Sequence, residues 1–344
     1  MIADDSAFMR KVLSDLFARQ PDFEVIGTAM NGKETVDKVK KLRPDLLTLD
    51  INMPVMDGLS ALAVIMRDCP LPVIMLSSVT KQGAKETIRA LELGAIDFVC
   101  KAGGEISRIE PIEADLLSRC RAAVRAKSLN GRIKSEVLKP SPSKLSAAKP
   151  SSEKVGRKLV AIGTSTGGPQ SLQQVIPLLP ADLPCGVVLV QHMPQGFTKP
   201  LAERLNSLSA VSVKEAEDGE TVKAGWVYIA PGGKHLRVAT ESFPYRLKLG
   251  EDPPVGNHRP AVNVLYDSVA SLGSNLVAVI MTGMGADGCE GMRKIKAQGG
   301  YSIAQNEETS VVYGMPKAVV EAGLADEVRP LGNIAEAIVE AVKK

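Results

Sequence analysis

The stretch KLVAIGTSTGGPQSLQQVIPLL, residues 158–179, joins a short apolar run to a helix-like run through a glycine-rich turn. A buried strand that leads through a tight turn into a helix is the repeating unit of a parallel α/β sheet. Three more strand-like runs follow it: CGVVLVQH, LVAVIMTG and GYSIAQN (185–192, 276–283 and 300–306). We therefore predict that residues 158–344 form a doubly wound α/β domain.

One stretch of this domain has another pattern. In GWVYIAPGGKHLRV, residues 225–238, two β-rich runs flank a Pro-Gly-Gly turn. Such a pattern is typical of a β-hairpin. We expect these residues to form a hairpin in addition to the parallel strands.

The N-terminal part shows the same alternation. The strand-like runs EVIGTA, LLTLD, VIMLSS and DFVC alternate with helix-like ones, and an amphipathic helix closes the series at residues 110–126. Residues 1–126 are thus predicted to be a second doubly wound α/β domain. Residues 127–157, rich in Ser, Pro, Ala and Lys, are predicted to be a flexible linker.

The charge of the chain is concentrated at this linker. Residues 127–158 contain nine basic and two acidic side chains, although the whole chain carries only +3. A basic tract can indicate nucleic acid binding, but aromatic residues are only 3% of the chain and offer no stacking surface. We interpret the tract as a solvated tether and expect no nucleic acid partner.

Cysteine usage and hydropathy indicate a cytoplasmic protein. The five cysteines form no C-x-x-C pair, which argues against a disulfide framework or a zinc site. The N-terminus has no signal-peptide pattern, and every apolar run is too short to span a bilayer. We expect no direct insertion into a membrane.

Three acidic residues stand at predicted strand ends in the N-terminal domain: Asp4, Asp5 and Asp50. The carboxyl ends of parallel strands converge on one crevice, where clustered carboxylates favour a cation such as Mg²⁺. Two further strand ends supply Ser77 and Lys101. A carboxylate, a cation, a hydroxyl and an ammonium together can accept and hold a phosphoryl group. Each residue alone could equally be a helix cap or a surface charge.

These positions resemble those of a response-regulator receiver domain, with Asp50 in the motif LDINMPVMDG (49–58). The resemblance implies a flavodoxin-like fold and phosphorylation of Asp50 by a chemotaxis histidine kinase. It implies an Mg²⁺ site made by Asp4, Asp5, Asp50 and the backbone carbonyl of Asn52, and a switch formed by Ser77, Phe98 and Lys101. The chain departs from the family twice. Ala102 stands where a proline is usual, and few apolar residues precede the acidic pair. This leaves open a different start of the chain or a weakened first strand.

In the C-terminal domain, Gly163-Thr-Ser-Thr-Gly167 is a G-x-S-x-G motif between a strand and a helix. This context exposes the hydroxyl of Ser165 on a sharp turn. The competing interpretation is a phosphate-binding glycine loop. The next predicted strand, however, ends in His192 rather than in the acidic residue that a dinucleotide site requires. Hydrolysis is therefore favoured.

Asp287 follows another predicted strand and completes a set in which Ser165 attacks, His192 acts as base and Asp287 orients the ring. His235 and His258 are the other histidines of the chain, and either could line the cleft or be a surface histidine with its hydrogen bonds satisfied. Glycines 283, 285 and 288 would let backbone N–H groups approach an oxyanion.

The order Ser, His, Asp and the motifs GTSTGGP, QHMP and TGMGADG resemble chemotaxis protein-glutamate methylesterases. The resemblance implies a Rossmann-like catalytic domain that demethylates glutamates of methyl-accepting chemotaxis receptors and also deamidates glutamines. We place Thr166, Met284 and Gly285 at the oxyanion and cleft. No cofactor is expected for catalysis, and Mg²⁺ belongs to the receiver. The unphosphorylated receiver is expected to block the catalytic cleft.

Two other function classes were weighed. A transcriptional regulator is disfavoured because the C-terminal part lacks a helix-turn-helix pattern. A non-catalytic receptor adaptor stays possible on sequence grounds, although the presence of Ser165, His192 and Asp287 disfavours it.

Overall fold

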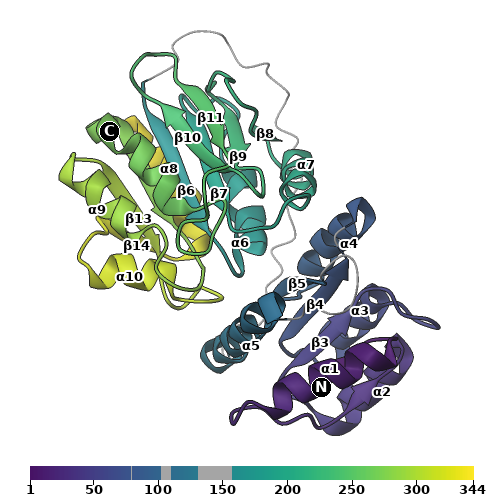
Figure 1. Cartoon of the computed structure of the whole chain (residues 1–344). Helices are drawn as coiled ribbons and strands as arrows, with labels where there is room; N and C mark the ends of the chain where they lie inside the picture. The colour runs from purple at the N-terminus through teal and green to yellow at the C-terminus, as the bar shows by residue number, and fades with distance from the viewer. Residues whose placement is uncertain (79, 102–109, 131–156) are drawn as a thin grey trace. The chain divides into compact units, whose positions relative to one another are not determined.

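The computed structural model describes residues 1–78, 80–101, 110–130 and 157–344. The chain divides into two compact units, Met1–Ser128 and Leu129–Lys344. Figure 1 shows that each unit has its own twisted sheet with helices packed on it. Most of the predicted linker lies outside the described residues, and its first four residues instead continue the last helix of the N-terminal unit to Asn130.

The N-terminal sheet has the strand order β2-β1-β3-β4-β5, and all of its pairs are parallel. Alternate strand residues such as Ile74 and Leu76 form one core with apolar residues of α1 and α5, so these two helices share one face of the sheet. The elements of this unit are β1 (Ile2–Ala3), α1 (Ala7–Ala18), β2 (Thr28–Ala29), α2 (Gly32–Leu42), β3 (Leu47–Asp50), α3 (Gly58–Asp68), β4 (Val73–Ser78), α4 (Lys81–Glu92), β5 (Asp97–Lys101) and α5 (Glu110–Asn130).

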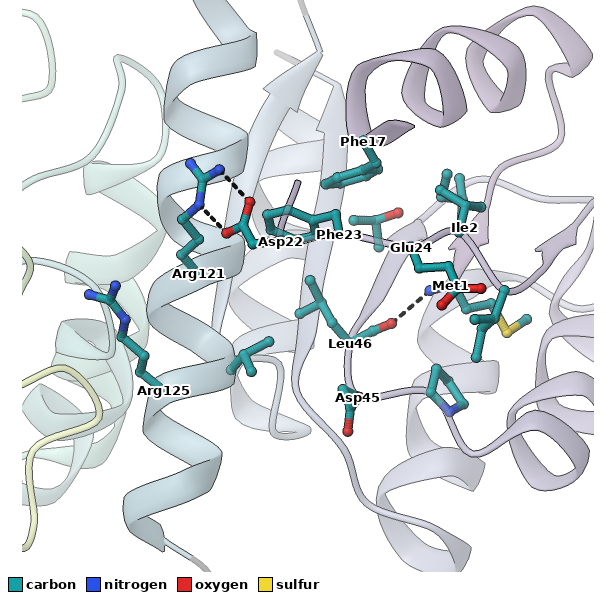
Figure 2. Close-up of a pocket in the computed structure, with 15 residues that line it drawn as sticks. Met1, Ile2, Phe17, Asp22, Phe23, Glu24, Asp45, Leu46, Arg121 and Arg125 are labelled. Carbon is teal, nitrogen blue, oxygen red and sulfur yellow. Dashed lines mark hydrogen bonds and ion pairs between the residues drawn. The ribbon is translucent and has the colours of Figure 1, made fainter. Parts of the chain in front are cut away.

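Strand β1 lies inside the sheet, between β2 and β3, although it has only two residues. It pairs with both β2 and β3, and the Met1 ammonium donates a hydrogen bond to the carbonyl of Leu46 at 2.9 Å (Figure 2). Beside Met1 is a cavity of about 420 Å³ lined in part by Phe17, Phe23 and Leu46. Burial lowers the pKa of the Met1 amine to about 6. Met1 and Ile2 are among the residues that line the cavity, so the cavity borders the start of β1.

The C-terminal sheet has seven strands in the order β14-β13-β12-β6-β7-β9-β8, and every pair is again parallel. The two units therefore confirm the predicted α/β class. The elements are β6 (Leu159–Thr164), α6 (Gly168–Val175), β7 (Gly186–Gln191), α7 (Thr198–Leu208), β8 (Ser212–Glu215), β9 (Trp226–Ile229), β10 (His235–Ala239), β11 (Arg246–Gly250), α8 (Val262–Val269), β12 (Leu276–Ile280), α9 (Cys289–Ala297), β13 (Tyr301–Gln305), α10 (Met315–Glu321), β14 (Glu327–Arg329) and α11 (Ile334–Lys343).

The predicted hairpin of residues 225–238 is wrong in its pairing. Its first half is β9, which lies between β7 and β8 in the parallel sheet, and its second half is β10, which pairs antiparallel with β11. Because Val227, Tyr228 and Ile229 are fully buried, the first run had to enter the large sheet. The domain does contain a β-hairpin, but residues 235–250 form it.

Both faces of the C-terminal sheet are covered. One set of strand residues, including Ala161 and Val188, packs with residues of α8, α9, α10 and the hairpin. The alternate set, including Ile162 and Leu189, is also fully buried. Continuous burial on two faces explains the uninterrupted apolar runs of the sequence. Among the described residues, no helix has the length and apolar character needed to cross a membrane.

Candidate functional site

Ser165 stands in the turn between β6 and α6. The backbone N–H of Gly168 donates to the carbonyl of Ser165 at 2.7 Å, and Gly167 has a φ of 77°. This left-handed conformation favours glycine and closes the turn tightly. The exposed fraction of Ser165 is only 6%, so its hydroxyl lies in a nearly enclosed site.

His192 is brought beside this turn by the register of two strands. Thr164 of β6 pairs with Gln191 of β7, so Ser165 and His192 are the next residues on neighbouring parallel strands. Such strands lie about 4.8 Å apart. The backbone N–H of His192 donates to the carbonyl of Thr164 at 3.1 Å, which extends the pairing to the histidine itself.

Gln191 was not among the predicted site residues. Its side-chain amide donates to the carbonyls of Ser165 and His192, at 3.0 and 3.2 Å. It therefore ties together the two backbone segments that carry the serine and the histidine. The predicted motif QHMP contained this residue, but nothing in the pattern indicated where its amide would point.

Asp287 holds the imidazole of His192. Its Oδ2 atom lies 2.8 Å from Nε2 of His192, and its carboxylate also accepts the backbone N–H groups of Val262 and Asn263. Burial raises the pKa of Asp287, but the contact with His192 and the two N–H donors outweigh burial and bring the pKa below its usual value. The carboxylate is therefore ionised at neutral pH.

The second ring nitrogen of His192 faces no hydrogen-bond partner within the described part of the chain, although it is buried. No hydrogen bond joins the Ser165 hydroxyl to His192 among these residues. Because Asp287 occupies Nε2, Nδ1 is the nitrogen left to receive a proton. Hydrogen bonds between a nucleophile and its base are often longer in unliganded sites and shorten when a substrate binds.

The predicted oxyanion residues lie in two turns that are bonded to each other. Thr166 follows Ser165, and Met284 and Gly285 follow β12. The hydroxyl of Thr282 donates to the carbonyl of Thr166 at 2.9 Å, and the N–H of Ser165 donates to the carbonyl of Thr282 at 3.0 Å. Gly285 has a φ of 82° and open space where a side chain would be.

The other two histidines have different environments. The ring of His258 stacks on that of His192, whereas His235 is fully buried and hydrogen-bonded to backbone groups of Pro253 and Ala261. His258 thus lies against the ring of His192, as one of the two expected roles requires. His235 is not the surface histidine that the other role describes, because it is fully buried and bonded to the backbone.

The N-terminal unit gathers a second group of polar side chains. Oxygen atoms of Asp4, Asp5 and Asp50 lie within 4.8 Å of one another. The ammonium of Lys101 lies 2.8 Å from both Asp4 and Asp50. Burial raises the pKa of Asp50 to about 6, with a smaller contribution from Asp4 and Asp5 against the lowering effect of Lys101. A divalent cation fits this set, because the single ammonium leaves excess negative charge among oxygen ligands.

Ser77 and Phe98, the predicted switch residues, are both buried. The hydroxyl of Ser77 is hydrogen-bonded to the hydroxyl of Thr87 and the carbonyl of Gly83, both in α4. It is therefore engaged with this helix and not with Asp50. Asn52, in the loop after β3, is exposed beside this cluster in sequence.

Comparisons with known proteins give the same division of the chain. Residues 160–338 match the CheB methylesterase family, and residues 1–109 match the response regulator receiver domain. Proteins named protein-glutamate methylesterase/protein-glutamine glutaminase from Geobacillus kaustophilus and Bacillus subtilis are 48% and 47% identical, over 99% and 100% of this chain and 98% of theirs. A crystal structure of the Thermotoga maritima CheB methylesterase catalytic domain matches with 51% identity and a TM-score of 0.53, covering 54% of this chain and 99% of that domain.

Proposed function

The chain belongs to the CheB methylesterase family, and we propose that it hydrolyses γ-methyl esters of glutamate side chains on methyl-accepting chemotaxis receptors. The observation that carries this proposal is the contact of His192 with Asp287, on the strand next to the Ser165 turn. The names of the full-length relatives support the ester substrate and a second, glutamine substrate.

The proposed reaction has two steps. The Ser165 hydroxyl attacks the ester carbonyl while Nδ1 of His192 takes its proton, and Asp287 stabilises the imidazolium that forms. The same proton then passes to the departing methoxide, which leaves as methanol. Water, deprotonated by His192, hydrolyses the acyl-serine to release the glutamate. Backbone N–H groups near Thr166, Met284 and Gly285 would stabilise the oxyanion in both steps.

The same residues can act on glutamine. An amide and an ester pass through similar tetrahedral intermediates, and here ammonia leaves after it receives the proton of His192. Neither reaction calls for a cofactor in the catalytic unit.

We further propose that phosphorylation of Asp50 by a chemotaxis histidine kinase regulates this activity. Asp4, Asp5, Asp50 and the carbonyl of Asn52 would hold Mg²⁺, which neutralises the carboxylates while Asp50 is phosphorylated. Lys101 would then contact the phosphoryl group, and Ser77 and Phe98 would change their contacts. The unphosphorylated receiver would inhibit the catalytic unit. With these proposed roles, the protein would act in the cytoplasm and would have receptors and a kinase as its partners.

The decisive experiment measures methanol release from methylated receptor membranes. Wild type should release methanol faster when a small-molecule phosphodonor and Mg²⁺ are added, and Ser165→Ala should release none. Ser171→Ala is the matched control, since the Ser171 hydroxyl donates to the carbonyl of Gly167 within the same segment and, among the described residues, contacts neither His192 nor Asp287. Activity that survived in Ser165→Ala would refute the serine mechanism.

The second candidate function, a receptor adaptor without catalysis, predicts another result. Wild type would then bind receptor membranes and release no methanol. A reactive-serine probe would also fail to label Ser165, because an unactivated serine hydroxyl is a weak nucleophile.

A further inference from the structure

The imidazoles of His192 and His258 lie face to face. Their ring centroids are 3.8 Å apart and their planes differ by 10°. His192 is almost fully buried, so one face of its ring is covered by another imidazole instead of by solvent. Neither the position of His258 nor its partner was indicated by the sequence.

A tight turn delivers His258 to this place. The backbones of Val255 and His258 exchange two hydrogen bonds of 3.0 Å, and the two residues between them, Gly256 and Asn257, have φ values of 59° and 66°. Two consecutive positive φ values are the property of type I′ turns, which Gly and Asn tolerate best. The turn is thus a defined local structure.

The segment that contains this turn is fastened at both sides by a third histidine. Nδ1 of His235 accepts the backbone N–H of Ala261 at 3.3 Å, and its Nε2 lies 3.1 Å from the carbonyl of Pro253. The two contacts tie both nitrogens of the His235 ring to the backbone on either side of the turn. Arg259 adds a hydrogen bond to the carbonyl of Glu251.

The same segment continues directly into the groups that hold Asp287. Val262 and Asn263, at the start of α8, donate their backbone N–H groups to its carboxylate at 2.6 and 2.9 Å. Residues 253–263 therefore contact His192 in two ways: through the ring of His258 against its face, and through Asp287 at Nε2.

We propose that His258 is a positioning residue for His192, an inference that rests on the proposed function of the Ser165 site. A hydrogen bond at one nitrogen leaves the ring of a histidine free to turn over a broad range of its second torsion angle. The stacked ring of His258 restricts that turn, so that Nε2 stays on Asp287 and Nδ1 keeps one orientation, in which it can serve Ser165 once substrate is bound.

The test compares His258→Ala, His258→Phe and Asn257→Gly in the full-length protein. His258→Ala should lower kcat for methanol release by on the order of 10- to 100-fold, the size expected for a misplaced catalytic group, with little change in KM. His258→Phe keeps a flat ring and should restore kcat to within about threefold of wild type. Asn257→Gly keeps the positive φ of the turn and should behave as wild type.

A second readout does not depend on the receptor. With only three histidines in the chain, ¹⁵N-NMR of histidine-labelled protein can follow the tautomer of His192. We expect one tautomer, with the proton on Nε2, in wild type and His258→Phe, and a mixture in His258→Ala.

Three results would overturn the proposal: a kcat in His258→Ala within threefold of wild type, a kcat in His258→Phe as low as in His258→Ala, or a loss confined to KM. The first would show that the stack has no role, the second that the ring acts through its nitrogens, and the third that His258 contacts substrate. If wild type itself released no methanol, the proposed function would fail, whereas the NMR comparison would still report on ring positioning.

Discussion

Oδ2 of Asp287 lies 2.8 Å from Nε2 of His192, and the same oxygen accepts the backbone N–H of Val262 at 2.6 Å. The carboxylate therefore serves two elements at once: it holds the imidazole of His192 at the end of β7, and it accepts a backbone N–H at the start of α8. The structural role of the carboxylate and the role of its charge can be separated by experiment, because a neutral amide has nearly the same shape but no charge.

Asp287→Asn should keep the fold and lose activity. The amide can still fill the site, but it cannot stabilise an imidazolium, and it can favour the wrong tautomer of His192. We expect kcat for methanol release to fall by about 10³- to 10⁴-fold. Circular dichroism of the same sample serves as the folding control, and a loss below tenfold would contradict the assigned role of Asp287.

The ionised form of Asp50 should destabilise the N-terminal unit. Its pKa is about 6 in the folded protein and 3.8 when unfolded, so the folded state favours the protonated carboxyl. The protonated carboxyl of Asp50 therefore stabilises the folded state relative to the unfolded chain. This stabilisation is complete below pH 3.8 and is lost as the pH rises through 6.

Asp50→Asn should therefore raise the free energy of unfolding at pH 7 by roughly 2 to 3 kcal/mol. This figure already includes the favourable contact of the ionised carboxylate with Lys101, which lowers the pKa of Asp50. The advantage should shrink towards pH 4. Hydrogen exchange in peptides covering β3 and β4 of the full-length protein measures the stability difference between wild type and Asp50→Asn at each pH. Equal protection of wild type and Asp50→Asn at pH 7 would show that the ionised Asp50 carboxylate does not destabilise the folded state.

The sequence predicted elements well where burial and periodicity agree. The run VIMLSS is β4, with the expected bounds, and the helix predicted at residues 110–126 is α5, which continues to Asn130. The predicted strands also fix where the strands end. Because parallel strands bring their carboxyl ends to one edge of a sheet, residues at those ends are predicted to lie near one another. For this reason the sequence alone predicts that Ser165 and His192 lie at one edge of the sheet.

The contacts that the sequence did not predict come from pairings without a periodic signal. Two β-rich runs around a Pro-Gly-Gly turn looked like one hairpin, yet β9 and β10 belong to different sheets. The stack of His258 on His192 depends on a turn more than sixty residues away in the chain, and no local pattern encodes such a distance. The pair Gly256-Asn257 was a readable turn signal, but it could not show which ring the next residue would meet.

The buried amine of Met1 should make the N-terminal unit sensitive to pH near neutrality. Its pKa is about 6 in the folded protein and 8.0 when unfolded, so the unfolded chain binds more protons between these values. Stability should rise by roughly 2 to 3 kcal/mol from pH 6 to pH 8 for a chain that begins with a free Met1.

Acetylation of Met1 removes this charge and should abolish that pH dependence. Three apolar residues placed before Met1 should do the same and add stability, because they can lengthen β1 into the cavity beside Phe17 and Phe23. Hydrogen exchange of β1 and β3 peptides at pH 6 and pH 8 distinguishes the charge effect from the filling of the cavity. A pH dependence unchanged by acetylation would assign it to another group.

The turn that carries Ser165, the proposed nucleophile, should not tolerate a side chain at Gly167. This residue has a φ of 77°, and a Cβ there would collide with the side chain of Val311. Gly299 is a matched control, since its φ is 81° but a Cβ there would meet open space. Gly299→Ala should therefore cost only the backbone strain, about 1 kcal/mol.

Gly167→Ala should cost at least about 1 kcal/mol more in the free energy of unfolding, because overpacking adds to the strain. It should also slow labelling by a reactive-serine probe at least tenfold, since the turn that presents Ser165 must shift to relieve the collision. The fluorescence of Trp226, the one tryptophan of the chain, reports unfolding of the C-terminal unit for both variants. Equal stability and equal labelling in the two variants would mean that Val311 moves aside and that the close packing against Gly167 does not hold the nucleophile in place.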